Sequence, residues 1–366
     1  MKFTATRTFT TMRIMVVALF AYSCCSLFDA TVKATTLDWS TAMSQASSTT
    51  NQLRAVSVAD QPSNDSVYIG FIQTTGANRR RVNQLSTTGA YPLLNQFLSG
   101  SSQQPKGIAT DDRGNVFTAY RDSGNTASYI QAFNSNLTTS GSVTPDVSAV
   151  VGGIAVQKSG SDYYAYTVYE AGGLVQRYNV TDPNAMVLDT SFGSGGTFAV
   201  PGANNLRGVE VGSDGSLYIA ARDDSNSPNP NGRVYKVSAD LTSTSFVQLT
   251  RAMDVAIWCE NLYATSYNGA NSFIRVMSLS DLSTVEDLTI STLDGNPYSR
   301  GSSEGWSGID IDSTGRIWLA DQAYGSTGGT QDRLLVSTAL PPCVPEPSTL
   351  AMLMLGLVGL GIARRR

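Results

Sequence analysis

The feature that most constrains the fold is a short motif that recurs six times. Each copy starts with a small residue, continues with alternating aliphatic residues and a turn containing Asp or Gly, and ends with an aromatic residue and Ala. The copies begin at Ala55, Gly107, Gly153, Gly208, Asp254 and Gly308, 46 to 55 residues apart. Internal repeats of this length are typical of arrays of one supersecondary unit.

Within a unit, the pattern predicts short antiparallel strands. Val209 and Val211 alternate with polar positions, residues 212–215 form a Gly-containing turn, and residues 217–220 form the return strand. Units of about 50 residues have the length of a four-stranded propeller blade. The sequence therefore predicts an all-β fold, a six-bladed β-propeller of four-stranded blades over residues 53–340. A β-sandwich or β-solenoid is the alternative fold, and six regular units argue against a sandwich.

These strand motifs resemble those of NHL and SMP-30/gluconolactonase-like propellers, whose blades begin with a Gly-Ile-Ala-Val-Asp-like strand. In the lactonase-like members, the resemblance implies a divalent cation on the propeller axis, held by Glu, Asn and Asp. Glu304, Asn205, Glu210 and Asp310 lie near first strands and carry suitable oxygens. They do not match that ligand pattern one by one. No metal ligand is therefore assigned, and the cofactor stays open.

The N-terminus predicts export. Three cationic residues precede an apolar run over residues 14–28, which is the pattern of a signal peptide. We expect residues 1–34 to be removed after Ala34, with cleavage after Ala30 as a competitor. An uncleaved anchor and a lipoprotein modified at Cys24 are the alternatives. Residues 35–52 form a lead-in or donate the outer strand that closes the ring.

The C-terminus predicts a single membrane helix. A linker over residues 341–349 precedes 14 apolar residues, 350–363, and three terminal arginines. The run is short against the roughly 20 residues of a stable span. The arginines favour the cytoplasmic side, which leaves the body outside. A buried C-terminal helix of the domain is the alternative.

This end of the chain resembles the PEP-CTERM sorting signal of Gram-negative bacteria. Its motif is Val344-Pro345-Glu346-Pro347, followed by the hydrophobic helix and by Arg364, Arg365 and Arg366. The resemblance implies processing by an exosortase in a bacterium that makes extracellular polysaccharide. It also implies an inner-membrane-tethered precursor, whose mature form reaches the cell surface or the extracellular matrix.

The composition argues against several kinds of catalytic and binding site. The chain contains no histidine, which excludes Ser-His-Asp catalysis and His-based zinc sites. Residues 35–343 contain 18 Lys and Arg against 27 Asp and Glu, so the body carries a net charge near −9. An acidic body argues against nucleic acid as a partner, because nucleic-acid binding needs clustered cations.

One candidate binding site emerges when the units are aligned. The residue before each first-strand motif is a cation in three units: Arg54, Lys106 and Arg207. First strands of blades line the central channel, so these cations should converge at one mouth and could hold an anionic sugar. The alternative is that they only pair with carboxylates such as Asp254, Glu210 or Glu304. Arg121-Asp122 and Arg222-Asp223 are interpreted as ion pairs within a blade.

Further predictions concern the aromatic residues and the cysteines. Aromatic residues recur on the second strands and should pack the blades, whereas Trp306 departs from that pattern and is a candidate for carbohydrate contact. Cys259 and Cys343 remain after signal removal. In an oxidising compartment they either form a disulfide or stay as two separate thiols.

The sequence thus predicts an exported, exosortase-sorted propeller, more a binding or structural protein than an enzyme. Extracellular polysaccharide is the expected partner. An extracellular metal-dependent lactonase or hydrolase is the alternative.

Overall fold

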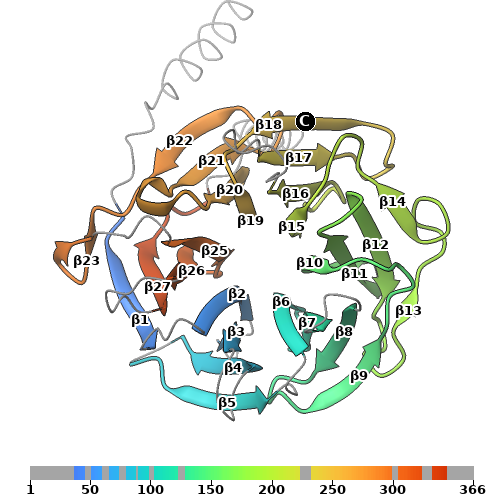
Figure 1. Cartoon of the computed structure of the whole chain (residues 1–366), viewed down its shortest axis with the longest axis horizontal. Coiled ribbons are helices and arrows are strands. Elements are labelled where there is room, and N and C mark those ends of the chain that lie inside the picture. The colour runs from blue at the N-terminus through green and yellow to red at the C-terminus, as the bar shows by residue number, and fades with distance from the viewer. Residues whose placement is uncertain are drawn as a thin grey trace, which may run out of the picture. The chain divides into compact units, whose positions relative to one another are not determined.

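Six antiparallel sheets stand around a common axis in the computed structural model (Figure 1). The structure describes residues 37–45, 51–59, 66–73, 80–87, 90–98, 103–122, 128–222, 232–298, 304–323 and 332–343. The prediction of an all-β, six-bladed propeller is confirmed. Within these residues the helical content is one 3-10 turn, η1 (Gly269–Asn271), and no helix is long and apolar enough to cross a membrane.

Each of the first three blades is a meander that starts at the channel and ends at the rim. Blade 1 comprises β2 (Asn51–Ala59), β3 (Ser66–Gln73), β4 (Arg80–Ser86) and β5 (Leu93–Leu98). Blade 2 comprises β6 (Gln103–Thr110), β7 (Val116–Asp122), β8 (Ser128–Phe133) and β9 (Thr139–Val143). Blade 3 comprises β10 (Val151–Ser159), β11 (Asp162–Tyr169), β12 (Leu174–Asn179) and β13 (Val187–Leu188), with β14 (Thr197–Ala199) also paired to β12. Blade 3 therefore exceeds the predicted four strands.

The remaining blades follow the same plan. Blade 4 comprises β15 (Leu206–Val211), β16 (Leu217–Ala221), β17 (Arg233–Val237) and β18 (Thr244–Gln248). Blade 5 comprises β19 (Ala252–Trp258), β20 (Asn261–Ser266), β21 (Ile274–Ser278) and β22 (Thr284–Leu288). Blade 6 comprises β25 (Glu304–Ile311), β26 (Arg316–Ala323), β27 (Asp332–Ala339) and β1 (Trp39–Gln45), and a small hairpin of β23 (Thr292–Leu293) and β24 (Asn296–Pro297) precedes it.

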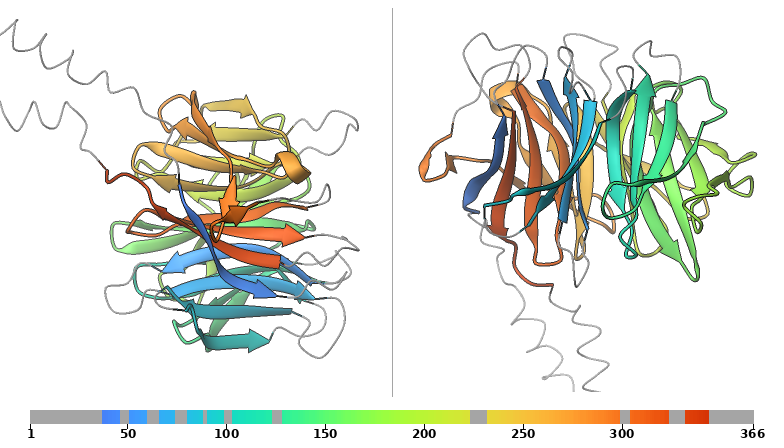
Figure 2. Two further views of the ribbon diagram at one scale, coloured as in Figure 1. Left: turned by 90° about the vertical axis from the view of Figure 1, so that its left-hand side faces the viewer. Right: turned by 90° about the horizontal axis from the view of Figure 1, so that it is seen from below.

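The ring is closed by strands from opposite ends of the chain. β1 pairs with β27 in antiparallel register, from Trp39 opposite Ser337 to Gln45 opposite Asp332 (Figure 2). The Asp294 carboxylate in the hairpin accepts hydrogen bonds from the Thr41 amide at 2.9 Å and the Thr41 hydroxyl at 2.7 Å. Of the two alternatives for residues 35–52, the structure thus places residues 39–45 in the closing strand.

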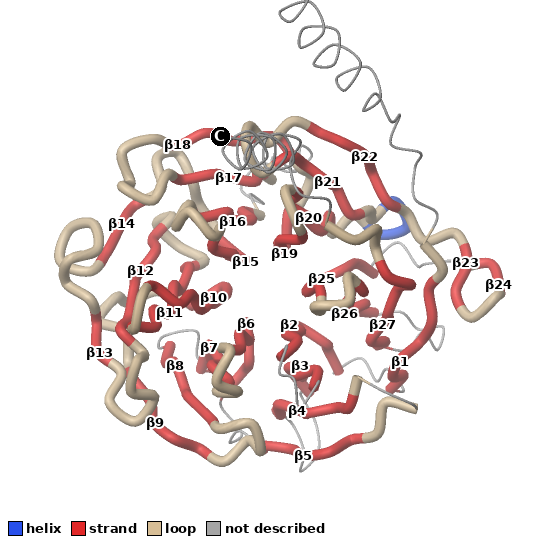
Figure 3. Tube along the Cα trace, turned by 180° about the vertical axis from the view of Figure 1, so that it is seen from behind, coloured by secondary structure: helices blue, strands red, loops and turns tan. Residues whose placement is uncertain are grey.

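The small residue that starts each motif lies where inner strands approach one another closely. A Cβ on Gly107 would lie 2.7 Å from the Ile154 amide nitrogen, and one on Gly153 would lie 2.4 Å from the Arg207 carbonyl oxygen. Backbones this close leave no room for a side chain. Figure 3 shows the six inner strands β2, β6, β10, β15, β19 and β25 gathered around the axis.

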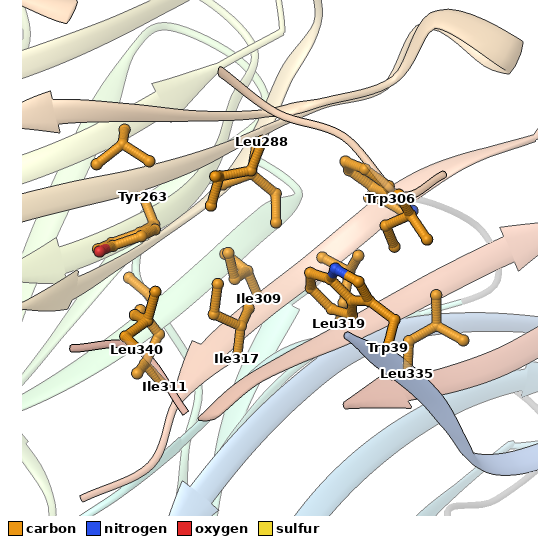
Figure 4. Packing of buried hydrophobic residues seen from close by; sticks show 14 of the residues in the cluster. Trp39, Tyr263, Leu288, Trp306, Ile309, Ile311, Ile317, Leu319, Leu335 and Leu340 are labelled. Atoms are coloured by element: carbon orange, nitrogen blue, oxygen red, sulfur yellow. The ribbon is translucent and has the colours of Figure 1, made fainter. Parts of the chain in front are cut away.

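Apolar side chains fill the spaces between neighbouring blades. The repeated second-strand aromatic residues are buried in all six blades, as predicted: Tyr68, Phe117, Tyr163, Tyr218, Tyr263 and Trp318. Figure 4 shows one cluster, in which Tyr263 and Leu288 of blade 5 pack near Ile309 and Leu319 of blade 6. The blades are thus held by face-to-face burial of apolar surface, and the axis is left for polar groups.

Candidate binding site at one mouth of the channel

A β-bulge interrupts every inner strand at the same point. The pairing register shifts between Leu53 and Ala55 in blade 1, and between Pro105 and Gly107 in blade 2. The remaining blades shift at the equivalent place. A bulge leaves one extra residue out of the ladder and re-aims its side chain. The bulge therefore explains why the residue before each motif can face the axis.

The bulge residues of all six blades line one hollow, which we call the cationic mouth. Its bulge residues are Arg54, Lys106, Gly152, Arg207, Met253 and Ser307. The volume of the hollow is about 30 Å³, room for about two or three water molecules. The structure thus brings together the three cations that the sequence singled out.

Glu170 is the carboxylate that two cations of this mouth, Lys106 and Arg207, contact. It follows β11 in blade 3, and its Oε1 accepts a hydrogen bond from Lys106 Nζ at 3.1 Å. Arg207 contacts the same oxygen, and Arg121 lies 3.8 Å from Oε2. Lys106 and Arg207 therefore pair with a carboxylate, but with one that sequence reasoning did not select. Arg121 pairs across a blade boundary, whereas a pair within its own blade was expected.

Three ionisable groups at the mouth have pKa values below their usual ones. Burial, together with Arg207, lowers the pKa of Arg54 to about 10, although Tyr267 and Glu170 oppose that shift. Burial, together with Arg54, lowers the pKa of Lys106 to about 7, although Glu170 opposes it. Burial alone would raise the pKa of Glu170, but Lys106 and Arg207 outweigh it and hold that pKa below its usual value. One carboxylate thus faces several cations.

Blades 2 to 6 each place a further side chain at an equivalent position beside the bulge. In each of these blades, the residue before the bulge pairs with a residue of the second strand. The residue that comes next in the sequence after that pairing partner carries the further side chain: Arg121, Glu170, Arg222, Tyr267 and Gln322. The Arg222 guanidinium lies 5.5 Å from the centre of the Tyr267 ring. The strand register, which the sequence does not give, is what makes Glu170 equivalent to Arg121 and Arg222.

Carboxylates in the middle of the channel tie blades together. Asp254 accepts hydrogen bonds from the amides of Val255 at 3.0 Å and Ile309 at 3.1 Å, which joins blade 5 to blade 6. Asp310 accepts from the amides of Ile311 and Val58, both at 2.7 Å, which joins blade 6 to blade 1.

These carboxylates line a wider part of the channel, of about 210 Å³. Glu210 accepts from the Val211 amide at 3.0 Å. Burial raises the pKa of Glu210 and of Asp254 to about 8, although amide donors favour their charged forms. Glu210 and Asp310, two of the candidate metal ligands, thus accept hydrogen bonds from backbone amides. Among the described residues, no group of three or more Asp, Glu or Cys side chains is placed to hold a metal ion.

The prediction that Trp306 contacts carbohydrate is wrong. Its side chain is 1% exposed and packs in the cluster between blades 5 and 6 (Figure 4). It stands opposite Asp321, directly before the bulge, where the other blades place residues such as Leu53 and Leu206. A ring enclosed in this way has no open face, so Trp306 cannot stack on a sugar.

Cys259 and Cys343 form a disulfide, with Cα atoms 5.4 Å apart. Beside it, Trp258 Nε1 donates to the Pro341 carbonyl oxygen at 3.3 Å, and the Leu340 amide donates to the Gly315 carbonyl oxygen at 2.8 Å. Three contacts thus fix residues 340–343, which follow β27, to blades 5 and 6.

Both predicted membrane segments lie outside the described residues, as do the sorting-motif residues. Residues 344–366 match the model of the PEP-CTERM protein-sorting motif. The tail implies an exported protein that is sorted by exosortase, and the fold shows that its body is a six-bladed propeller.

Solved structures with similar folds offer no activity for transfer. A protein of unknown function from Bacteroides caccae has a TM-score of 0.51 and 10% identity, over 80% of this chain and 90% of that chain. A functionally unknown protein from Desulfotomaculum acetoxidans has a TM-score of 0.49 and 11% identity, over 77% and 84%. A Lactobacillus plantarum protein has a TM-score of 0.46 and 11% identity, over 80% and 81%. No curated protein matches the sequence. The resemblance to NHL and SMP-30 propellers stays a prediction.

Proposed function

We propose that this protein is a non-enzymatic surface or matrix protein of a Gram-negative bacterium that binds acidic extracellular polysaccharide at the cationic mouth. One observation carries the proposal. Bulges in separate blades direct Arg54, Lys106 and Arg207 into one hollow, which Asp254 also lines, and both Lys106 and Arg207 contact Glu170.

Local charge supports an anionic ligand. Four cations lie around Glu170: Arg54, Lys106, Arg121 and Arg207. The mouth is therefore cationic, although the body as a whole is acidic. A cluster of one sign inside low-dielectric walls concentrates ions of the opposite sign. Guanidinium groups also suit the planar geometry of a carboxylate.

The size of the hollow favours an acidic group that projects from a larger molecule. A space of about 30 Å³ admits a carboxylate but not a sugar ring. A uronic acid residue of a polysaccharide meets this condition, because its carboxylate projects from the ring. The ring and the rest of the polymer would stay outside the mouth.

The alternative, a metal-dependent lactonase, has less support. Its expected ligands Glu210 and Asp310 accept hydrogen bonds from backbone amides, and among the described residues no group of three or more Asp, Glu or Cys side chains is placed to hold a metal ion.

Binding to oligogalacturonate tests the proposal. The mature protein should bind this ligand and not a neutral glucan of the same length. A variant with Arg54→Gln, Lys106→Gln and Arg207→Gln should lose binding. A control with Lys158→Gln, Lys236→Gln and Arg275→Gln removes the same charge elsewhere and should keep binding. Equal binding by both variants, with folding checked by circular dichroism, would refute the site.

A further inference from the structure

We propose that Lys106 is a reactive amine that forms an imine with small carbonyl compounds carrying a carboxylate, the 2-oxo acids. This inference rests on the proposed function, because the same cations would hold the carboxylate. It goes further in assigning covalent chemistry to one side chain.

The placement of Lys106 is unusual for a lysine. Its side chain is 7% exposed, yet it lines the hollow of the cationic mouth. Nζ lies 3.1 Å from Glu170 Oε1, and Arg207 contacts that same oxygen. The amine, a carboxylate and a guanidinium thus meet around one atom.

An amine must be neutral to attack a carbonyl carbon, and the surroundings of Lys106 favour the neutral form. Arg54 on β2, Arg207 on β15 and Arg121 on β7 repel a charged ammonium, whereas Glu170 attracts it. With burial, these groups lower the pKa of Lys106 to about 7. Lysines activated by desolvation or a neighbouring cation are known imine-forming groups.

Lys158 provides a contrast within the same chain. Its side chain is 53% exposed and pairs with Asp112 at 3.0 Å. Hydrogen bonds from Lys158 to Asp112 and Tyr163 raise its pKa. Lys158 is therefore charged at neutral pH, and its amine is far less nucleophilic than that of Lys106.

The proposed reaction needs no oxidant, reductant or metal. The Lys106 nitrogen lone pair adds to the carbonyl carbon, and the carbonyl C–O π bond breaks. Glu170 accepts a proton from the nitrogen and returns it to the oxygen. Loss of the hydroxyl with a second nitrogen proton releases water and leaves a C=N bond. Both protons lost by the amine are in the released water.

The cations select the class of carbonyl compound. Lys106 and Arg207 both contact Glu170 Oε1, so their charged groups lie close together. A ligand carboxylate bound beside Arg207 therefore places its adjacent carbon near Lys106 Nζ. A carbonyl at that carbon makes the ligand a 2-oxo acid. Neutral ketones and aldehydes lack the charge that would hold them there.

Reductive trapping tests the proposal. The mature protein is incubated with pyruvate and cyanoborohydride, which reduces an imine to a stable amine, and adducts are located by peptide mass spectrometry. We expect one adduct per chain at Lys106, at least tenfold above Lys158 and Lys236. Replacing pyruvate by acetone should remove that selectivity, and Lys106→Arg should remove the adduct while keeping the positive charge.

Two outcomes would overturn the inference: no adduct at Lys106, or equal labelling of all three lysines. Oligogalacturonate binding by the same preparation separates this failure from failure of the proposed function. Binding without an adduct sinks the reactive amine alone, whereas absence of both sinks the anion site on which it depends.

Discussion

Titration of Lys106 should make anion binding at the cationic mouth depend on pH. A bound anion stabilises the ammonium form, so the pKa of Lys106 rises in the complex above its value of about 7 in the free protein. Affinity is therefore greatest below that pKa and falls as pH rises through it. The free protein is about nine-tenths protonated at about pH 6 and about one-tenth at about pH 8, so affinity should fall about tenfold.

Calorimetric titration with oligogalacturonate measures this directly, because the carboxylates of that ligand stay ionised across the range. Proton uptake should approach one per anion bound near pH 8 and vanish near about pH 6. Asp254 and Glu210, whose pKa values are raised to about 8, would weaken binding in the same direction as they ionise.

Lys106→Arg separates the contributions, because arginine keeps its charge throughout this range. The variant should keep only the part of the slope that ionisation of Asp254 and Glu210 contributes. An unchanged tenfold slope in the variant would refute the assignment to Lys106, and a flat profile in the natural protein would refute the reasoning about its environment.

Three other predictions concern stability and sorting. Cys343→Ser should lower the free energy of unfolding by up to about 4 kcal/mol, because the disulfide spans 84 residues of sequence; thermal unfolding checks it, and an unchanged midpoint would mean that the bridge contributes nothing. Asp310→Asn should cost about 1–3 kcal/mol in urea unfolding, since one of two amides is left without an acceptor; an effect as small as that of a surface substitution would contradict the tie between blades 6 and 1. Glu346→Ala should leave unprocessed precursor in the inner membrane on fractionation, and normal release would argue against sorting by this motif.

The fold could be predicted because its physical requirements recur in each unit. Gly107 and Gly153 mark the close approach of inner strands, and the second-strand aromatic residues mark the space between blades. Outer strands such as β9 and β18 carry mixed polar residues with few buried positions, so they leave no comparable pattern. For the same reason β14 of blade 3 was not foreseen.

The site was predicted only in part. The cations were found because the bulge falls at a fixed place in the repeat. Glu170 was missed because it follows the second strand, where no recurring residue type draws attention to it. Trp306 was misjudged because the position before the bulge is occupied by apolar residues of differing shape, among them Leu53, Val151 and Ala252, and only the register shows that they are equivalent.

A crystal structure of the mature protein with bound oligogalacturonate tests the central claim most directly. We predict a ligand carboxylate between Lys106 and Arg207, within hydrogen-bonding distance of both, with the sugar rings outside the mouth. Ligand bound only at the blade rims, with the cationic mouth unoccupied at saturation, would contradict the account.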